Sequence, residues 1–291
     1  MAALVLLCAA VSQSCESIFE YEGDCSSVWR VDFRYDMNMK YADAFGHEAW
    51  AVTLYAFDQD GTLVWQNTEQ GDSLANEDYM MTLELAPGVY DLVAWSTCDK
   101  AKDCFAFPSV KAGKTTKQEL ICEMKKTRDE DGNAVSDKYL GSLMHGCVED
   151  LEISDVEGKH DVVMPMMKNT NDVRIILQHL SGESVDPAKF TFSITDTNGL
   201  LGHDNSLLPC EEIDYRPWRK DAVSTETETR AVTEVGALIA ELTLNRLMLE
   251  NKPRLNVFND KGETVLSIPL INYALMIKGH YDNMGDQEYL D

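Results

Sequence analysis

The sequence has little positive charge. Lys and Arg together number 25 among 291 residues, whereas Asp and Glu number 50, so the formal net charge is −25. A surface this acidic repels phosphate backbones, and no basic stripe interrupts it. Nucleic acid is therefore excluded as a partner.

Long hydrophobic runs are also missing. The longest apolar stretch covers residues 1–11, well short of the roughly 20 residues that a transmembrane helix needs. Its position predicts a signal peptide over residues 1–14, followed by a lipidated Cys15 and a linker over residues 15–27. Acyl chains such as palmitate on Cys15 would hold the protein on a membrane, because each buried methylene contributes about 0.8 kcal/mol.

Two features of this segment leave alternatives open. No Lys or Arg precedes the apolar stretch, and Gln13 fits a strict lipoprotein signal loosely. The missing positive charge is consistent with a true start upstream of Met1. The alternative to lipidation is a plain cleaved signal peptide, with Cys15 an ordinary cysteine.

Motifs of catalysis and of cofactor or metal binding are absent from the sequence. It contains no HExxH, no GxSxG, no P-loop and no GxGxxG after a strand, and its six histidines are scattered. The acidic segments DQDG and DEDGN lack the ligand spacing of a calcium loop. We therefore predict no catalytic, cofactor or metal residues. A hydrolase that uses a pair of carboxylates stays the weakest alternative, since no nucleophile or metal motif supports it.

Eight cysteines occur, and six remain if Cys8 is removed and Cys15 is lipidated. Six cysteines allow 15 pairings, which the sequence cannot distinguish. Cys98 and Cys104 flank a short polar segment and form the best candidate for a local disulfide in an oxidising compartment. Buried or free thiols are the alternative.

What the sequence does contain is β-periodicity. Residues 28–35 alternate between charged and apolar side chains, as a half-buried strand requires. Residues 51–65 predict a hairpin with its turn at Asp58–Gly61, and residues 79–95 predict another with Pro87 and Gly88 in a type II turn. A short helix is expected only within residues 43–51.

The second half repeats this pattern. Short apolar runs bounded by Asn, Asp and Gly predict strands at 171–180, 189–199, 254–270 and 273–281. Charged segments at 125–137 and 219–234 predict surface loops. Turn signals about every dozen residues favour antiparallel sandwiches. We therefore expect an exported, all-β protein with one sandwich at 28–168 and a second at 169–291, acting as a binding or structural module.

Several long motifs resemble one family, and they occur in its order. The sequence is similar to the FimB-type fimbrial anchor lipoproteins of Bacteroidales from about Cys15 to the last residue. The motifs that carry the resemblance are FRYDMNMKYADAF (33–45), VTLYAFDQDGTLVW (52–65), LAPGVYDLVAW (85–95), MPMMKNTNDVRIILQ (164–178), NRLMLENKPRLNVFNDKGETVLSIPLINYAL (245–275) and DQEYLD (286–291).

This resemblance implies two tandem transthyretin-like (Ig-like) antiparallel β-sandwiches. It also implies an outer-membrane lipoprotein, lipidated at Cys15 and exposed at the cell surface at the base of a type V fimbrium. The implied role is non-enzymatic: the protein would tether the fimbria and influence its length, with a fimbrial shaft subunit (fimbrillin) as partner. Family members usually continue with further strands after DQEYLD. The sequence therefore predicts either a truncated chain or a second sandwich without its closing strands.

Strand addition is the mechanism that this role suggests. In it, an extended segment of one subunit pairs with an open sheet edge of another. We expect the second sandwich to meet the shaft, because lipid would hold the first. The alternative function is a surface glycan-binding lipoprotein, which would need a cluster of exposed aromatic side chains on one face.

Overall fold

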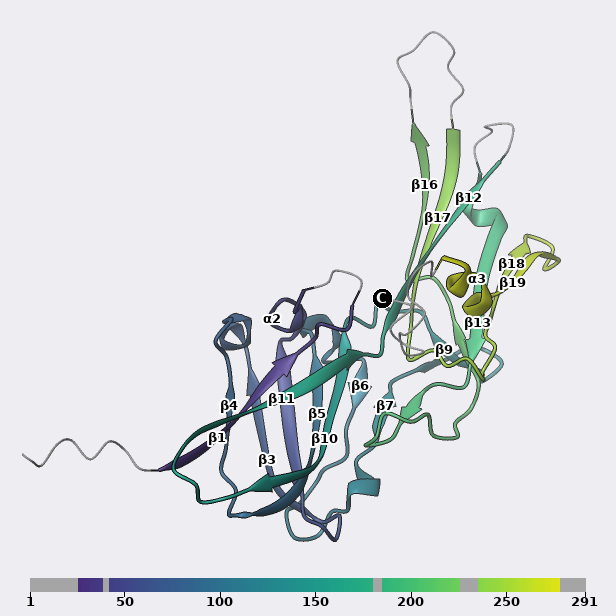
Figure 1. Cartoon of the computed structure of the whole chain (residues 1–291). Coiled ribbons are helices and arrows are strands. Elements are labelled where there is room, and N and C mark those ends of the chain that lie inside the picture. Colours follow the sequence, from purple (N-terminus) through teal and green to yellow (C-terminus); the bar gives the residue numbers. More distant parts are fainter. Residues whose placement is uncertain (1–25, 39–41, 180–184, 226–234, 278–291) are drawn as a thin grey trace, which may run out of the picture.

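The computed structural model describes residues 26–38, 42–179, 185–225 and 235–277. Cys15 and the expected signal peptide and linker up to residue 25 lie outside these residues. The described chain is β-structure almost throughout, in two sandwiches (Figure 1). Strand β1 begins at one end of the molecule, and the β16–β17 hairpin lies at the other.

The first sandwich is built from a seven-stranded sheet with the order β3-β2-β5-β10-β11-β1-β4. Its helix α2 (Phe45–Glu48) is a single turn, within the range expected from the sequence. The strands are β1 (Ser27–Arg34), β2 (Ala51–Phe57), β3 (Leu63–Gln70), β4 (Met81–Leu83), β5 (Gly88–Thr97), β10 (Leu143–Ile153) and β11 (Gly158–Lys168).

Strand β11 joins the two layers of this sandwich. Residues 158–165 pair with β1 in parallel, whereas residues 166–168 pair with β10. Gly146 lies at this corner, opposite Met166. A Cβ atom there would approach the Pro165 carbonyl oxygen to 2.8 Å and the Met166 sulfur to 2.6 Å. Glycine therefore lets the two layers meet closely.

The second sandwich pairs a three-stranded sheet, β12-β17-β16, with a six-stranded sheet, β19-β18-β13-β15-β9-β8. Helix α3 (Leu270–Ile277) follows the last strand. The strands are β8 (Thr127–Arg128), β9 (Ala134–Ser136), β12 (Asn171–Gln178), β13 (Phe190–Asp196), β15 (Ile213–Tyr215), β16 (Arg219–Thr225), β17 (Val235–Leu244), β18 (Arg254–Asn259) and β19 (Thr264–Pro269).

A small third sheet lies between the sandwiches, with the order β14-β7-β6. Its strands are β6 (Phe105–Ala106), β7 (Cys122–Met124) and β14 (Leu200–Leu201), and four 3₁₀ turns complete the described elements: Asp72–Ala75, Asp99–Ala101, Lys117–Glu119 and Pro187–Lys189. Because β14 pairs with β7, and β15 pairs in parallel with β9, two ladders link segments far apart in sequence.

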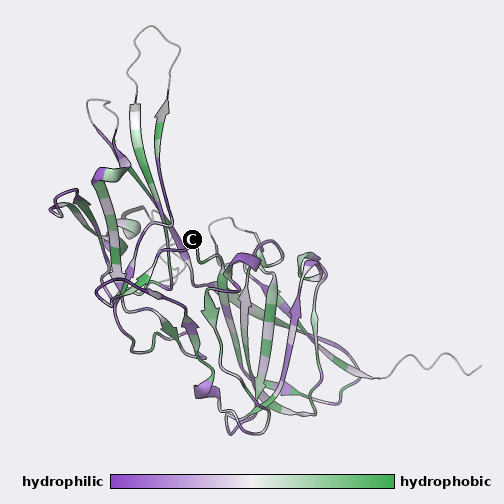
Figure 2. Ribbon diagram, turned by 180° about the vertical axis from the view of Figure 1, so that it is seen from behind, coloured by the Kyte–Doolittle hydropathy of each residue, from purple (hydrophilic) through white to green (hydrophobic). Residues whose placement is uncertain are grey.

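Two hydrophobic cores follow from this arrangement. One fills the first sandwich and includes Val31 and Phe33 of β1, the alternation expected for residues 28–35. The other begins on the outer face of β2 and β5, at Tyr55 and Trp95, and continues without interruption into the second sandwich. The alternating colours along the strands in Figure 2 show the same periodicity. The shared core makes the two sandwiches one packed body.

The structure confirms the hairpin at 51–65, in which β2 pairs with β3, but not the one at 79–95. There, β4 pairs with β1, whereas β5 lies between β2 and β10. A type II turn needs a positive φ at its second central residue, and Gly88 does not have one. The chain instead crosses from one layer to the other.

Three further expectations were wrong in their local structure. Residues 125–137 contain β8 and β9, since Ala134 and Val135 are buried against the second sandwich. Residues 219–225 form β16, and 226–234 lie outside the described residues. A strand was expected at 273–281, but residues 273–277 belong to helix α3. Pro269 ends the strand ladder before them, and leucine, alanine and methionine favour a helix.

Candidate functional site at the junction of the sandwiches

Among the described residues, no three His, Cys, Asp or Glu side chains lie close enough together to hold a metal ion. No helix in the described ranges is long and apolar enough to span a bilayer. The arrangements that could serve a function are a buried polar network and a pocket, both at the junction of the sandwiches, and open strand edges.

The buried network joins three segments that are distant in sequence. The amides of Asn169 and Asn205 donate to each other's oxygen at 2.8 and 2.9 Å. Arg246 donates to the Asn169 side-chain oxygen at 3.3 Å and contacts the Met167 sulfur at 3.0 Å. Because these side chains are buried and bonded to one another, they fix the orientation of β11 relative to the second sandwich.

His145 extends this network into the first sandwich. It projects from β10, and its ring lies 4.6 Å from that of Trp95 in an edge-on contact. Burial lowers the pKa of His145 to about 4, although its hydrogen bond with the His203 carbonyl acts in the opposite direction. The imidazole is therefore neutral at neutral pH, and its Nε2–H donates to that carbonyl oxygen over 2.8 Å.

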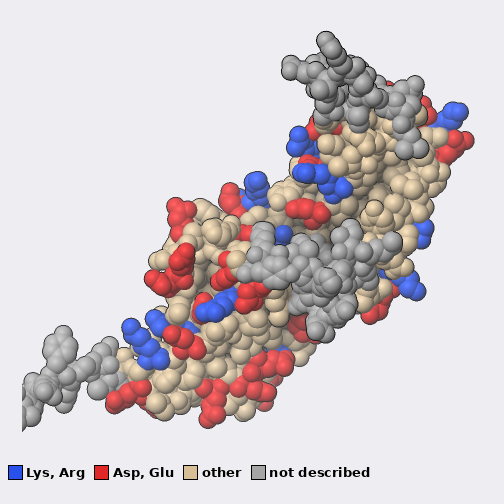
Figure 3. Space-filling model, turned by 45° about the horizontal axis from the view of Figure 1, so that its top comes forward, with Lys and Arg blue, Asp and Glu red and all other residues tan. Residues whose placement is uncertain are grey.

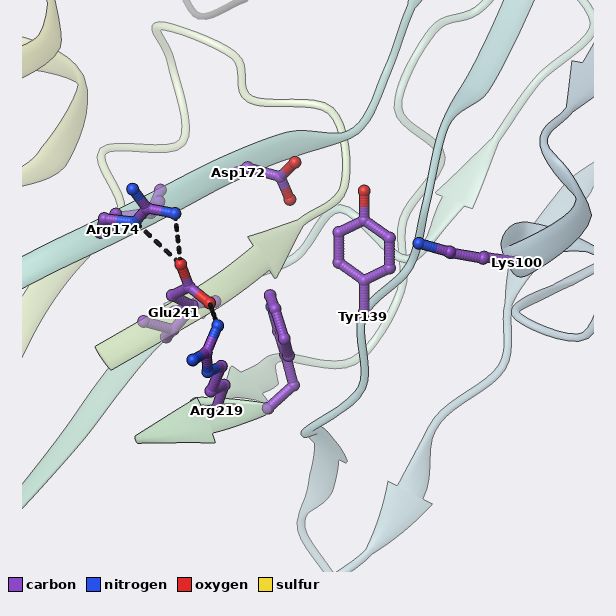
Figure 4. A pocket seen from close by; sticks show the side chains of 9 residues that line it. Lys100, Tyr139, Asp172, Arg174, Arg219 and Glu241 are labelled. Atoms are coloured by element: carbon purple, nitrogen blue, oxygen red, sulfur yellow. Dashed lines mark hydrogen bonds and ion pairs between the residues drawn. The ribbon is translucent and has the colours of Figure 1, made fainter. Parts of the chain in front are cut away.

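The pocket, with a volume of about 640 Å³, lies between the outer face of the three-stranded sheet and two side chains of the first half (Figure 4). Lys100 and Tyr139 come from the first half. The side chains contributed by the second half are Asp172, Val173, Arg174, Trp218, Arg219, Glu241 and Leu242.

A row of opposite charges crosses the floor of this pocket. Arg174 of β12 and Arg219 of β16 are both aligned with Glu241 of β17. The Arg174 guanidinium lies 2.6 Å from one Glu241 oxygen, and that of Arg219 lies 3.6 Å from the other. Since Glu241 is buried while both arginines are more exposed, the pair of cations neutralises a carboxylate that would otherwise be costly to bury.

The aromatic wall of the pocket consists of Tyr139 and Trp218. Their rings meet edge to face with centroids 5.2 Å apart, and the Lys100 ammonium lies 5.5 Å from the Tyr139 centroid. Burial raises the pKa of Tyr139, so its hydroxyl stays protonated. An aromatic wall beside charged side chains suits the binding of a polar ligand or peptide.

Neither Cys98 nor Cys104, the cysteines predicted to form a disulfide, lines the pocket. Cys15 is outside the described residues. Cys98 and Cys104 flank the 3₁₀ turn at Asp99–Ala101, and both are free thiols in this structure. The Cys104 sulfur lies 3.6 Å from the Tyr139 carbonyl oxygen, while Cys98 accepts a hydrogen bond from the Ser142 amide. Their pairing stays a prediction.

Sequence reasoning missed the junction network. Its members, His145 included, come from four separate segments, so no motif of fixed spacing in the sequence predicts that they meet. One signal was available: residues 168–172 (KNTND) are a polar run between two apolar strands.

Acidic side chains are spread along the face in Figure 3, with basic ones in small groups between them.

Two open strand edges have little of the charge that usually protects an edge. Strand β19 ends the six-stranded sheet and carries no charged residue. Its adjacent Val265 and Leu266 are 53% and 39% exposed, so both of its faces are uncovered. Strand β12 ends the three-stranded sheet, and its uncharged final part includes Ile176, which is 60% exposed. Such edges can pair with another strand.

Comparisons with known proteins identify the relatives of this chain. The family model for fimbrillin-A associated anchor proteins Mfa1 and Mfa2 matches residues 21–291. The minor fimbrium anchoring subunit Mfa2 of Porphyromonas gingivalis is 23% identical over 230 residues, which cover 77% of this chain and 67% of Mfa2. The solved structure of the fimbrial anchor protein Mfa2 from Porphyromonas gingivalis shares the fold, with a TM-score of 0.64 at 18% identity, over 90% of this chain and 87% of its own.

Two solved structures from Bacteroides thetaiotaomicron are more similar. A candidate adhesin is 34% identical, with a TM-score of 0.78, over 93% of this chain and 89% of its own. A candidate polysaccharide-binding protein is 29% identical, with a TM-score of 0.76, over 91% of this chain and 88% of its own. The chain therefore belongs to the family of fimbrillin-A associated anchor proteins Mfa1 and Mfa2, which confirms the fimbrial anchor family expected from its motifs.

Proposed function

We propose that this protein is an outer-membrane lipoprotein that anchors a fimbria to the cell surface and influences its length. The observation that carries the proposal is the family match over residues 21–291. The role is structural, and its partner is a fimbrial shaft subunit. The pocket and the network at the junction fit this role, since they join and orient two sandwiches rather than assemble a nucleophile with a base.

Cys15 is the proposed point of attachment to the membrane. Only the short polar segment at residues 12–14 separates it from the apolar stretch at residues 1–11. Lipid on Cys15 would place the start of β1 next to the membrane, because only residues 16–26 separate the two. The first sandwich would then face the membrane, and the second would face the fimbria.

The proposed contact with the fimbria is strand addition at the second sandwich. The edge of β19 and the uncharged final part of β12, residues 175–178, support it, since main-chain hydrogen bonds could continue either sheet. The edge of β16 is less suitable, because Arg219, Lys220 and Asp221 follow one another there. A crosslinking map in which the shaft subunit contacts only the first sandwich would contradict this arrangement.

The decisive experiment compares wild-type cells with a Cys15→Ala strain and quantifies fimbriae on cells and in the medium. We expect fimbriae to move from the cells into the medium. Cys25→Ala is a matched control, since it also removes a cysteine near the N-terminus and should leave fimbriae attached. If the protein stays in the membrane fraction and fimbriae are unaffected, Cys15 is not the anchor. If the protein is released and fimbriae stay attached, the fimbrial role is wrong.

A second candidate is a surface glycan-binding lipoprotein. The observation that favours it is the aromatic wall of Tyr139 and Trp218, which borders the pocket beside Arg219 and Asp172. A glycan array with the purified protein tests it. Binding that disappears in Trp218→Ala would support this function, whereas an array without hits would remove it.

A further inference from the structure

The N-terminal strand of the first sandwich pairs with the last strand of the same sandwich. Strand β1 pairs in parallel with β11 over eight aligned residues, from Ser27 opposite Gly158 to Arg34 opposite Pro165. Strand β11 then leads, through Asn169 and Thr170, directly into β12 of the second sandwich. The first and last strands of the first sandwich are thus neighbours that run in the same direction (Figure 1).

We propose that the β1–β11 pair is a mechanical clamp, which carries tension between the N-terminal tether and the second sandwich in shear. The inference rests on the proposed function for the direction of the load. Tension from the membrane would enter at the beginning of β1, and tension from the fimbria would enter at the end of β11. Because the strands are parallel, these points lie at opposite ends of the pair.

Shear distributes the load over the whole ladder. When two paired strands are pulled along their length in opposite directions, all hydrogen bonds between them must yield together. When they are pulled apart from the same end, the bonds break one at a time. The forced unfolding rate depends on the height of this barrier, so the geometry of loading sets mechanical strength even when the equilibrium stability is unchanged.

Strand β1 is also held on its other side. Residues 29–31 pair with β4 in antiparallel orientation, from Trp29 opposite Leu83 to Val31 opposite Met81. Val31 and Phe33 are buried in the core of the first sandwich. To leave the sheet, β1 must therefore break two ladders and expose two apolar side chains.

Side chains fasten the same pair of strands. The Arg30 guanidinium binds both oxygens of Asp161 at 2.8 Å, and these two residues are aligned in the register. Trp29 stacks on His160 with ring centroids 4.6 Å apart. Both contacts cross from β1 to β11, so sliding one strand along the other would break them.

The far end of β11 is fastened as well. Residues 166–168 pair with β10, and the backbone N–H of Asn169 donates to the Leu143 carbonyl oxygen at 2.7 Å. Asn169 then enters the buried pair with Asn205 of the second sandwich. The load path thus runs from β1 through β11 into the junction network without crossing an exposed loop.

Single-molecule force measurements on the purified protein test the clamp. In both arrangements, one handle is attached at the N-terminus. In the first, the other handle is inserted in the β18–β19 turn at residues 260–262, so that β1 and β11 are sheared. In the second, it is inserted in the β10–β11 turn at residues 155–157, next to the start of β1, so that the strands are unzipped.

We expect the release of β1, identified by the length of chain that it frees, to require about twofold or more force in the first arrangement at the same loading rate. If the second sandwich unfolds before β1 in the shearing arrangement, at a force above that of unzipping, the clamp is stronger than the second sandwich, which also supports the proposal. Equal forces in the two arrangements would overturn it.

Two variants test the side-chain contacts. Arg30→Ala should lower the force in the shearing arrangement while changing the unzipping force little. Arg34→Ala is the matched control, because Arg34 binds Asp32 of its own strand and should change neither. If Arg30→Ala behaves like Arg34→Ala, the Arg30–Asp161 contact does not belong to the clamp. Since these measurements need no fimbria, their result is independent of the Cys15→Ala experiment on cells.

Discussion

The imidazole Nε2 of His145 and the carbonyl oxygen of His203 are 2.8 Å apart, and this hydrogen bond joins the central strand of the first sandwich to a loop of the second. The carbonyl can only accept, so the ring donates. Protonation of the other ring nitrogen would place a charge among buried side chains with Arg246 nearby. The junction therefore depends on a neutral His145.

This dependence predicts a loss of stability in mild acid. The pKa of His145 is about 4 when folded and near 6.5 when unfolded. Between these values, the unfolded chain binds more protons, so the free energy of unfolding falls as pH decreases from about 6.5 toward 4, by at most about 1.4 kcal/mol per pH unit from this group. Urea unfolding at pH 7.5 and 5.0 measures the change.

The variant His145→Gln isolates that contribution, since its amide can still donate but does not titrate. Its stability should vary less between the two pH values than that of the wild type. His47→Gln is the control, because His47 is exposed. A His145→Gln protein with the pH dependence of the wild type would contradict the assignment.

The reciprocal amide pair predicts a specific cost for Asn169→Ala. The substitution leaves the buried amide of Asn205 without its partner. We expect the free energy of unfolding to fall by about 1–3 kcal/mol, as measured by chemical denaturation. Asn67→Ala is the comparison, since the Asn67 amide has only a long contact of 3.4 Å with Glu69. Equal losses for the two variants would show that the pair adds nothing to the junction.

Close approach at the corner of the first sandwich predicts that Gly146→Ala is destabilising. Its methyl group would lie too close to the Pro165 carbonyl oxygen, and overpacking of this kind costs about 1–3 kcal/mol. Ser96→Ala on the adjacent strand β5 is a control of opposite sign. The Ser96 hydroxyl is buried without a hydrogen-bond partner among the described residues, so its removal should leave stability unchanged or raise it. The midpoint of thermal unfolding, measured for both variants and the wild type, tests these expectations. A Gly146→Ala protein as stable as the wild type would contradict the close approach.

Cysteine spacing predicts a disulfide between Cys98 and Cys104 after export. Peptide mapping of the exported protein without reduction should recover the two cysteines in one linked fragment. Burial raises the pKa of Cys104, so if the bond is absent, its thiol should react with alkylating reagents only after unfolding. Recovery of both as free thiols from the oxidising compartment would show that the pairing is wrong.

Periodicity located strands that have one buried face, and turn residues located the partner only where a strand pairs with its neighbour in sequence. Residues 28–35 alternate because one face of β1 is buried, and the hairpin of β2 and β3 follows from a turn at Asp58–Gly61. Neither signal identified a partner that is distant in sequence. Strand β9 pairs with β15, and β4 pairs with β1 rather than with β5. Local patterns cannot show such pairings, because they depend on the path of the chain between the strands.

The sequence by itself determined the all-β class, the acidic surface and the family, because composition, alternation and long ordered motifs are properties of the chain alone. The tertiary structure alone decided which strands pair, and it brought together His145, Asn169, Asn205 and Arg246 from separate segments. It also placed β1 parallel to β11. The physical reason is that burial and hydrogen bonding between distant segments exist only once the chain has folded.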